Sequence, residues 1–94
     1  MSAAAKRLVI RGQVQGVGYR GAAVQAAFAL GVIGWVRNRR DGYVEALAQG
    51  EPETIERFVA WCRRGPPLAL VVEITAFEVE VDTVLSAFET RATA

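Results

Sequence analysis

The sequence contains no histidine and a single cysteine, Cys62. One cysteine cannot form a disulfide within the chain, and without histidine the chain cannot supply a zinc site of the usual Cys/His kind. Catalytic triads and acid–base schemes that depend on histidine are excluded as well. Any chemistry must therefore rest on other polar side chains, on the lone cysteine or on backbone amides.

Long apolar segments are also missing. No apolar run approaches the roughly 18 residues of a membrane span, and the N-terminal "MSAAAKR" lacks the hydrophobic stretch of a signal peptide. A chain of 94 residues, 52% of them hydrophobic, supplies one small core. We therefore expect a single cytoplasmic domain over residues 1–94, a monomer without a membrane partner, with frayed ends at residues 1–5 and 91–94.

The net charge of +1 conceals two halves of opposite sign. Residues 1–44 carry seven Lys/Arg against one acid, and residues 45–94 carry four against nine. The basic half can be an ordinary solvated surface. Because it also contains a glycine-rich stretch, the combination points to an anionic ligand.

The first half of the sequence predicts a strand, a helix and a hairpin. Alternation of basic and apolar residues in "KRLVIRG" predicts the strand. In "YRGAAVQAAFALG", the spacing of Val24, Ala27 and Phe28 predicts a helix that stops at Gly31. The segment "VIGWVRNRRDGYVEALAQG" predicts two strands joined by a turn at "RDG".

The second half predicts a helix and further strands. Pro52 stands near the start of the helix. Its apolar stripe comprises Ile55, Phe58, Val59 and Cys62. Residues 70–82 predict a strand whose apolar positions change face, so we expect a bulge or bend near residues 75–76. A short piece at residues 87–90 is expected to add an edge strand.

The order strand, helix, strand, strand, helix, strand predicts an α+β, ferredoxin-like βαββαβ sandwich, with a mostly antiparallel sheet and both helices on one face. RNA-recognition modules share this topology and stack bases on aromatic side chains of the third strand. Here Tyr43 is followed on the same face by Glu45 and Leu47. We therefore expect no nucleic-acid partner.

The stretch "RGQVQGVGYRG" contains four glycines between the first strand and the first helix. Gly16, Gly18 and Gly21 match the G-x-G-x-x-G pattern, and Asp41 follows about 20 residues later. A dinucleotide site is nevertheless excluded, because Asp41 lies in a hairpin turn and the chain is too short for a Rossmann fold. The ATP-binding P-loop is excluded because no Lys-Ser/Thr pair follows.

A strand-to-helix loop of this kind can turn its backbone N–H groups inward at a helix N-terminus, where the helix carries partial positive charge. Arg20 stands at the end of the loop, and its guanidinium can hold a phosphoryl group through two parallel hydrogen bonds. The pattern therefore predicts an anion cradle. A tight turn with a solvated Arg20 is the alternative.

The stretches "GQVQGVGYR" and "GWVRNRRDGYVEA", in this order, closely resemble the acylphosphatase family, and "GPPLA" resembles a further segment of it. The resemblance runs from about Lys6 to Phe88. It implies a catalytic arginine at Arg20 and a water-orienting asparagine at Asn38. It also implies a phosphate-binding loop that comprises Gln13, Val14, Gln15, Gly16, Val17, Gly18, Tyr19 and Arg20.

The resemblance implies an enzyme that hydrolyses small-molecule acyl phosphates to a carboxylate and inorganic phosphate. The leaving carboxylate has a conjugate acid with a pKa near 4, so no general acid is needed. We expect loop amides and Arg20 to hold the phosphoryl group while Asn38 orients a water for in-line attack, with no metal, cofactor or phosphoenzyme. The alternative is a non-catalytic anion- or phosphate-binding regulatory module.

Other polar and aromatic residues are expected to have structural roles. Strand alternation places Arg37 and Arg39 opposite Asn38, and with Arg40 they are expected to be surface charges. Cys62 is expected in the core, and the carboxylates of strand 70–82 on an exposed face.

Overall fold

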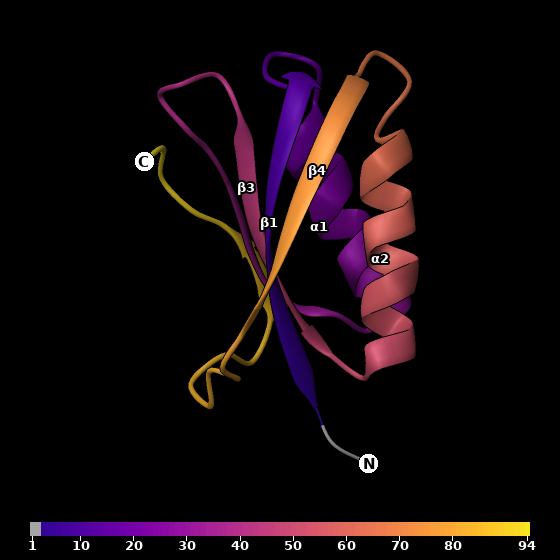
Figure 1. The fold of residues 1–94 in the computed structure, drawn as a ribbon, viewed down its shortest axis with the longest axis vertical. Helices are drawn as coiled ribbons and strands as arrows, with labels where there is room; N and C mark the ends of the chain where they lie inside the picture. The colour runs from indigo at the N-terminus through magenta and orange to yellow at the C-terminus, as the bar shows by residue number, and fades with distance from the viewer. Residues whose placement is uncertain (1–2) are drawn as a thin grey trace.

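The computed structural model describes residues 3–94, which form five strands and two helices (Figure 1). The strands are β1 (Ala4–Gln13), β2 (Ile33–Asn38), β3 (Val44–Gly50), β4 (Leu70–Val79) and β5 (Phe88–Thr90). The helices are α1 (Tyr19–Leu30) and α2 (Pro52–Arg64). Within residues 3–94, neither helix is long and apolar enough to cross a membrane.

The strands form one sheet in the order β4-β1-β3-β2-β5. Neighbouring strands are antiparallel, except that β2 and β5 are parallel. Both helices lie on the same side of the sheet (Figure 1). The predicted ferredoxin-like α+β fold is confirmed, and so is the short edge strand near residues 87–90.

The core lies between the two helices and the sheet face that they cover. The predicted stripe of α2 is confirmed, because Ile55, Phe58, Val59 and Cys62 are all buried. The prediction for α1 is wrong at Phe28, which is 88% exposed. Instead α1 buries Tyr19, Ala23 and Ala27. These residues are four apart and form one row, whereas Phe28 lies about 100° further around the helix than Ala27.

The bulge in the β1–β4 pairing lies at Val72, and the expectation of a bulge near residues 75–76 is wrong. Arg11 pairs with Glu73 and Gly12 with Val71, so Val72 is the extra residue. Gly12 has φ 135°, and a Cβ atom there would overlap the carbonyl oxygen of Leu70. The change of face that suggested the later bulge has another cause. Phe77 lies on the open face of the sheet, where the Arg7 guanidinium covers its ring.

Residues 1–5 and 91–94 are expected to fray, and in the described part of the chain both ends form backbone pairs with the sheet. Ala4 pairs with Gly50 at the start of β1. Ala94 donates a backbone hydrogen bond to Asn38 and accepts one from Arg40. These bonds continue the edge that β5 adds beside β2 and satisfy backbone groups that fraying would leave to water. Residues 1–2 lie outside the described part of the chain.

Strand direction brings distant parts of the sequence to one end of the sheet. Both β1 and β2 are antiparallel to β3, which lies between them, so they run in the same direction. The loop that follows β1 and Asn38, the last residue of β2, therefore lie at the same end. In Figure 1 this is the upper end, where α1 begins.

Candidate active site

The loop between β1 and α1 forms a cradle of backbone N–H groups. Gly16 and Gly18 have φ 73° and 79°, the left-handed region that glycine adopts without strain. Among residues 3–94, none of the backbone N–H groups from Gln15 to Gly21 donates a hydrogen bond within the chain. Because α1 begins at Tyr19, the last of these groups belong to its first turn, which carries partial positive charge. Such a cradle is suited to an anion.

A hollow of about 300 Å³ opens over this cradle. Its lining comprises Val14, Gly16, Gly18, Tyr19, Arg20, Gly21, Asn38 and Thr90. The structure therefore brings together the two residues to which the sequence assigned chemistry, Arg20 from the first turn of α1 and Asn38 from the end of β2. The remaining predicted loop residues, Gln13, Gln15 and Val17, do not line the hollow.

Asn38 lines this hollow, and its side-chain oxygen is unusual. Its Oδ1 atom is buried, and it has no hydrogen-bond partner among the described residues. A buried polar atom without a partner is costly, so most such atoms in proteins are satisfied. An amide oxygen can accept hydrogen bonds, and among the described residues Oδ1 of Asn38 makes no use of this capacity.

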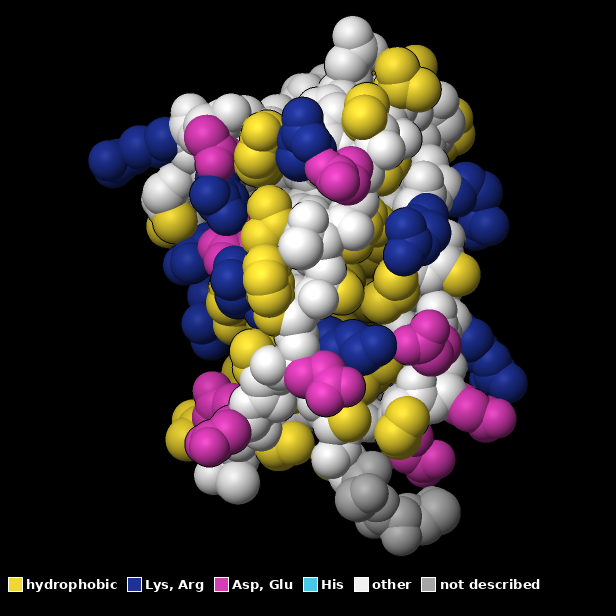
Figure 2. Space-filling model, viewed as in Figure 1, with side chains coloured by type: hydrophobic (Ala, Val, Ile, Leu, Met, Phe, Trp, Pro, Cys, Tyr) yellow, Lys and Arg dark blue, Asp and Glu magenta, His cyan; other side chains and the backbone are white. Residues whose placement is uncertain are grey.

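Ion pairs neutralise much of the basic half of the chain but not Arg20. Because β1 lies against acidic elements, Lys6 pairs with Glu56, Arg7 with Glu45, and Arg11 with Glu73. Figure 2 shows the result, with dark-blue basic side chains interleaved with magenta acidic ones. Within residues 3–94, Arg20 belongs to none of the ion pairs. Its charge remains available to an anion in the hollow.

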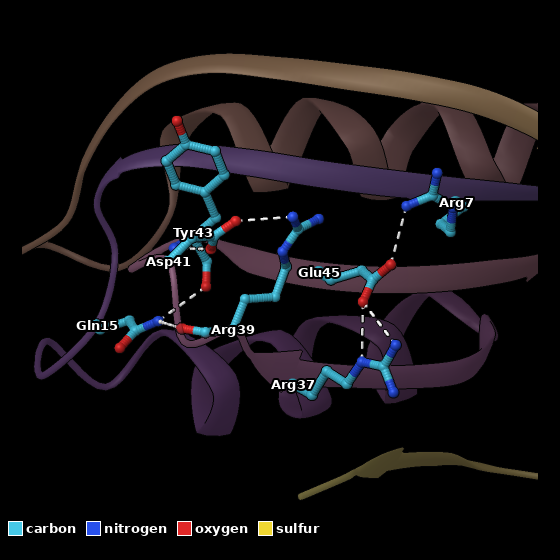
Figure 3. Close-up of polar contacts among 7 residues, drawn as sticks. All are labelled: Arg7, Gln15, Arg37, Arg39, Asp41, Tyr43 and Glu45. Carbon is cyan, nitrogen blue, oxygen red and sulfur yellow. Dashed lines mark hydrogen bonds and ion pairs between the residues drawn. The ribbon is translucent and has the colours of Figure 1, made fainter. Parts of the chain in front are cut away.

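The three arginines beside Asn38 lie outside the hollow. Arg37 forms an ion pair with Glu45, which also pairs with Arg7 (Figure 3). Burial disfavours ionisation of Glu45, but the hydrogen bonds and positive charges of Arg37 and Arg7 together outweigh it and lower its pKa. Arg39 pairs with Asp41 in the turn between β2 and β3. Arg37, Arg39 and Arg40 instead border a separate depression.

Two predicted loop residues point their side chains away from the hollow. Tyr19 is buried, and its hydroxyl donates a hydrogen bond to the backbone carbonyl of Cys62 at 2.8 Å. Burial raises the pKa of this hydroxyl far above its ordinary value, so it stays protonated. Gln15 directs its amide toward the β2–β3 turn. Tyr19 and Gln15 thus offer an anion only their backbone groups.

Gly21 and Thr90 line the hollow but were not among the predicted site residues. Gly21 directly follows Arg20 in the sequence, whereas Thr90 lies far from it. Thr90 belongs to β5 and pairs with Val36 of the neighbouring β2, two residues before Asn38. The sequence predicted a short strand here, but no sequence pattern indicated which strand of the sheet it would pair with. Only the parallel pairing of β5 with β2 places Thr90 beside the hollow.

The sequence model of the acylphosphatase family matches residues 6–90. An acylphosphatase from Albidiferax ferrireducens is 56% identical over 78 residues, which cover 83% of this chain and 85% of that protein. The structure of an acylphosphatase from Coxiella burnetii matches with a TM-score of 0.90 at 34% identity, over 95% of this chain and 93% of that one. Full-length HypF in its phosphate- and nucleotide-bound form matches with a TM-score of 0.89 at 30% identity, over 98% of this chain and 12% of HypF. The chain described here therefore belongs to the acylphosphatase family, enzymes that hydrolyse acyl phosphates.

Proposed function

We propose that Arg20 and the loop amides hold the phosphoryl group of an acyl phosphate while Asn38 orients the water that attacks phosphorus. The observation that carries this proposal is the shared hollow, which Arg20 and Asn38 both line. Among residues 3–94, Arg20 belongs to no ion pair and the Oδ1 atom of Asn38 has no hydrogen-bond partner. The cradle N–H groups supply further donors for phosphoryl oxygens.

The reaction asks little of the protein beyond position and charge. The water oxygen forms a bond to phosphorus while the bond from phosphorus to the acyl oxygen breaks. The electron pair leaves with the carboxylate, whose conjugate acid has a pKa near 4, so the leaving group needs no proton. The proton of the water passes to solvent or to the phosphate product. A loose phosphoryl-transfer transition state is stabilised by groups that hold its oxygens in place.

Asn38 positions the water without acting as a base. Its side-chain oxygen accepts a hydrogen bond from the water, and an amide does not take up a proton near neutral pH. This leaves a water lone pair free to face phosphorus. For in-line displacement, the water must approach phosphorus opposite the leaving carboxylate.

We propose that hydrolysis proceeds without a metal ion. Arg20 and the first turn of α1 supply the positive charge that a metal contributes in many phosphoryl-transfer enzymes. Within the described residues, there is no group of three or more His, Cys, Asp or Glu side chains that could hold a metal ion. We also propose that a monomer is active, because a single chain already brings the cradle, Arg20 and Asn38 around one hollow.

The test is steady-state hydrolysis of benzoyl phosphate with and without a chelator, with p-nitrophenyl phosphate as a control. We expect turnover of benzoyl phosphate alone, unchanged by the chelator. Loss of turnover on chelation would refute the metal-free mechanism. Binding of inorganic phosphate without any turnover would favour the alternative of a non-catalytic phosphate-binding module.

A further inference from the structure

We infer that the side chain of Gln15 is a positioning residue that fixes the phosphate cradle relative to Asn38. The inference rests on the proposed roles of the cradle and of Asn38. It assigns to Gln15 a role distinct from phosphate binding, which the sequence had implied for this residue.

Gln15 joins the cradle loop to the β2–β3 turn. Its Nε2 donates one hydrogen bond to the backbone carbonyl of Arg39 at 2.7 Å and one to that of Tyr43 at 2.8 Å (Figure 3). A glutamine amide nitrogen carries two hydrogens, so both donors are used. Because both partners are carbonyls, which only accept, the nitrogen and not the oxygen of the amide must face them. The orientation of the side chain is thereby fixed.

The two acceptors, the carbonyls of Arg39 and Tyr43, lie at the two ends of a turn that is closed by its own backbone hydrogen bonds. Arg39 donates its backbone N–H to the carbonyl of Tyr43 at 2.9 Å, and Gly42 donates to the carbonyl of Arg39 at 3.1 Å. The Asp41 carboxylate accepts the backbone N–H of Tyr43 at 3.0 Å. The turn thus offers Gln15 two carbonyls at fixed positions. One of them belongs to Arg39, the residue that directly follows Asn38.

The backbone of Asn38 is held on its other side as well. Asn38 pairs with Val44 between β2 and β3, and the backbone carbonyl of Asn38 accepts the N–H of Ala94 at 3.0 Å. The cradle, in contrast, contains Gly16 and Gly18, whose backbones have wide conformational freedom. Val14, on the other side of Gln15, is buried in the core. The two side-chain hydrogen bonds of Gln15, which we call the tether, therefore join a glycine-rich loop to a rigid turn.

The tether matters because in-line attack depends on where the water lies relative to phosphorus. The loop sets the phosphorus position and Asn38 sets the water position, so an error in their separation slows chemistry. A displacement of about 1 Å can cost about 100-fold in rate. Binding of the phosphoryl group depends on the cradle and Arg20 alone and is less sensitive to this separation.

A double-mutant cycle tests the inference. With benzoyl phosphate, Gln15→Ala is expected to lower kcat by about 10- to 100-fold, while the Kd for inorganic phosphate changes by less than about threefold. In the Asn38→Ala background the same change should lower kcat by less than about threefold, because the residue that Gln15 positions is already absent. Gln25→Ala, an exposed glutamine on α1, serves as the matched control and should leave kcat unchanged.

Equal losses of kcat in the two backgrounds would overturn the inference, as would a loss of phosphate binding as large as the loss of kcat. If Asn38→Ala alone retains normal kcat, the proposed role of Asn38 fails and the inference fails with it. If Asn38→Ala is impaired and the Gln15 effect is additive, only the inference fails. Thermal unfolding verifies that each variant folds. Gln15→Met, which keeps the length of the side chain without a donor, replaces Gln15→Ala if that variant does not fold, with the same expected results.

Discussion

The hydroxyl of Tyr19 and the backbone carbonyl of Cys62 are joined by a buried hydrogen bond of 2.8 Å. Tyr19 is the first residue of α1, and Cys62 lies in the last turn of α2. The carbonyl of Cys62 lacks the usual helical donor four residues later, because Pro66 has no N–H. Tyr19 supplies that donor and ties the end of the cradle to the neighbouring helix.

Removing this hydroxyl should cost stability more than activity. We expect Tyr19→Phe to lower the free energy of unfolding by about 1–3 kcal/mol, because a buried carbonyl loses its partner. Because Tyr19 offers substrate only its backbone, kcat on benzoyl phosphate should change by less than about threefold. Urea unfolding together with steady-state kinetics checks both expectations. An unchanged unfolding midpoint would show that the carbonyl finds another donor.

Cys62 should make stability depend on pH in the alkaline range. Burial raises the pKa of its thiol to about 12, from an ordinary value of 9.0. The folded chain then keeps a proton that the unfolded chain releases, so stability is complete below the unfolded pKa and falls as pH rises above it. The slope from this group is at most about 1.4 kcal/mol per pH unit.

Urea unfolding of the parent and of Cys62→Ala between about pH 8 and pH 10 measures this slope. Cys62→Ala starts from a lower stability because it leaves a small cavity, but its stability should fall less over this interval. Staying below pH 10 limits the contribution of Tyr19, whose pKa is also raised by burial. Parallel declines in the two proteins would contradict the prediction.

Arg20 should be irreplaceable even by lysine. Arg20→Lys keeps the charge but loses the planar fork that can hold two phosphoryl oxygens at once. We expect kcat/KM on benzoyl phosphate to fall by about 100- to 1,000-fold, with weaker binding of inorganic phosphate. Arg63→Lys, an exposed arginine at the end of α2, is the control. Near-normal activity of Arg20→Lys would show that a point charge suffices.

Asn38 should affect turnover and not affinity. We expect Asn38→Ala to lower kcat by about 100- to 1,000-fold, because the attacking water loses the acceptor that orients it. KM and the Kd for inorganic phosphate should stay within about threefold of the parent values. A raised KM with unchanged kcat would instead assign Asn38 to substrate binding.

Gly12 and Gly18 both have positive φ, but they should respond differently to alanine. A Cβ atom at Gly12 would overlap the Leu70 carbonyl oxygen, whereas nothing lies within 4 Å of one at Gly18. We expect Gly18→Ala to cost about 1–2 kcal/mol from backbone strain alone. Gly12→Ala should cost more than about 3 kcal/mol, since β4 must move. Urea unfolding of the two variants measures the difference, and equal costs would contradict this account.

Much of the fold was predictable because local periodicity agrees with the tertiary structure. The apolar stripe of α2 and the alternation in β1 each identify their buried face. Two predictions failed where the deciding partner lies elsewhere in the chain. The bulge at Val72 depends on the close approach of β4 to Gly12, and the exposure of Phe28 depends on which row of small residues α1 packs on the sheet.

The site was predictable in its parts but not in its assembly. The glycine loop and Arg20 are neighbours in the sequence, so their pattern indicated a cradle. Asn38 joins them only because β1 and β2 run in the same direction, and its function was suggested by family resemblance alone. No local pattern could indicate that the Gln15 amide contacts the turn or that Thr90 lines the hollow, since both depend on long-range pairing.

The parallel pairing of β5 with β2 also sets the order in which a newly made chain can become an enzyme. Arg20 and Asn38 leave the ribosome before Thr90, which lines the same hollow and pairs with Val36 of β2. A nascent chain can therefore carry its reactive residues well before their enclosure exists. Completion of the hollow must wait until β5 has been made and has paired with β2.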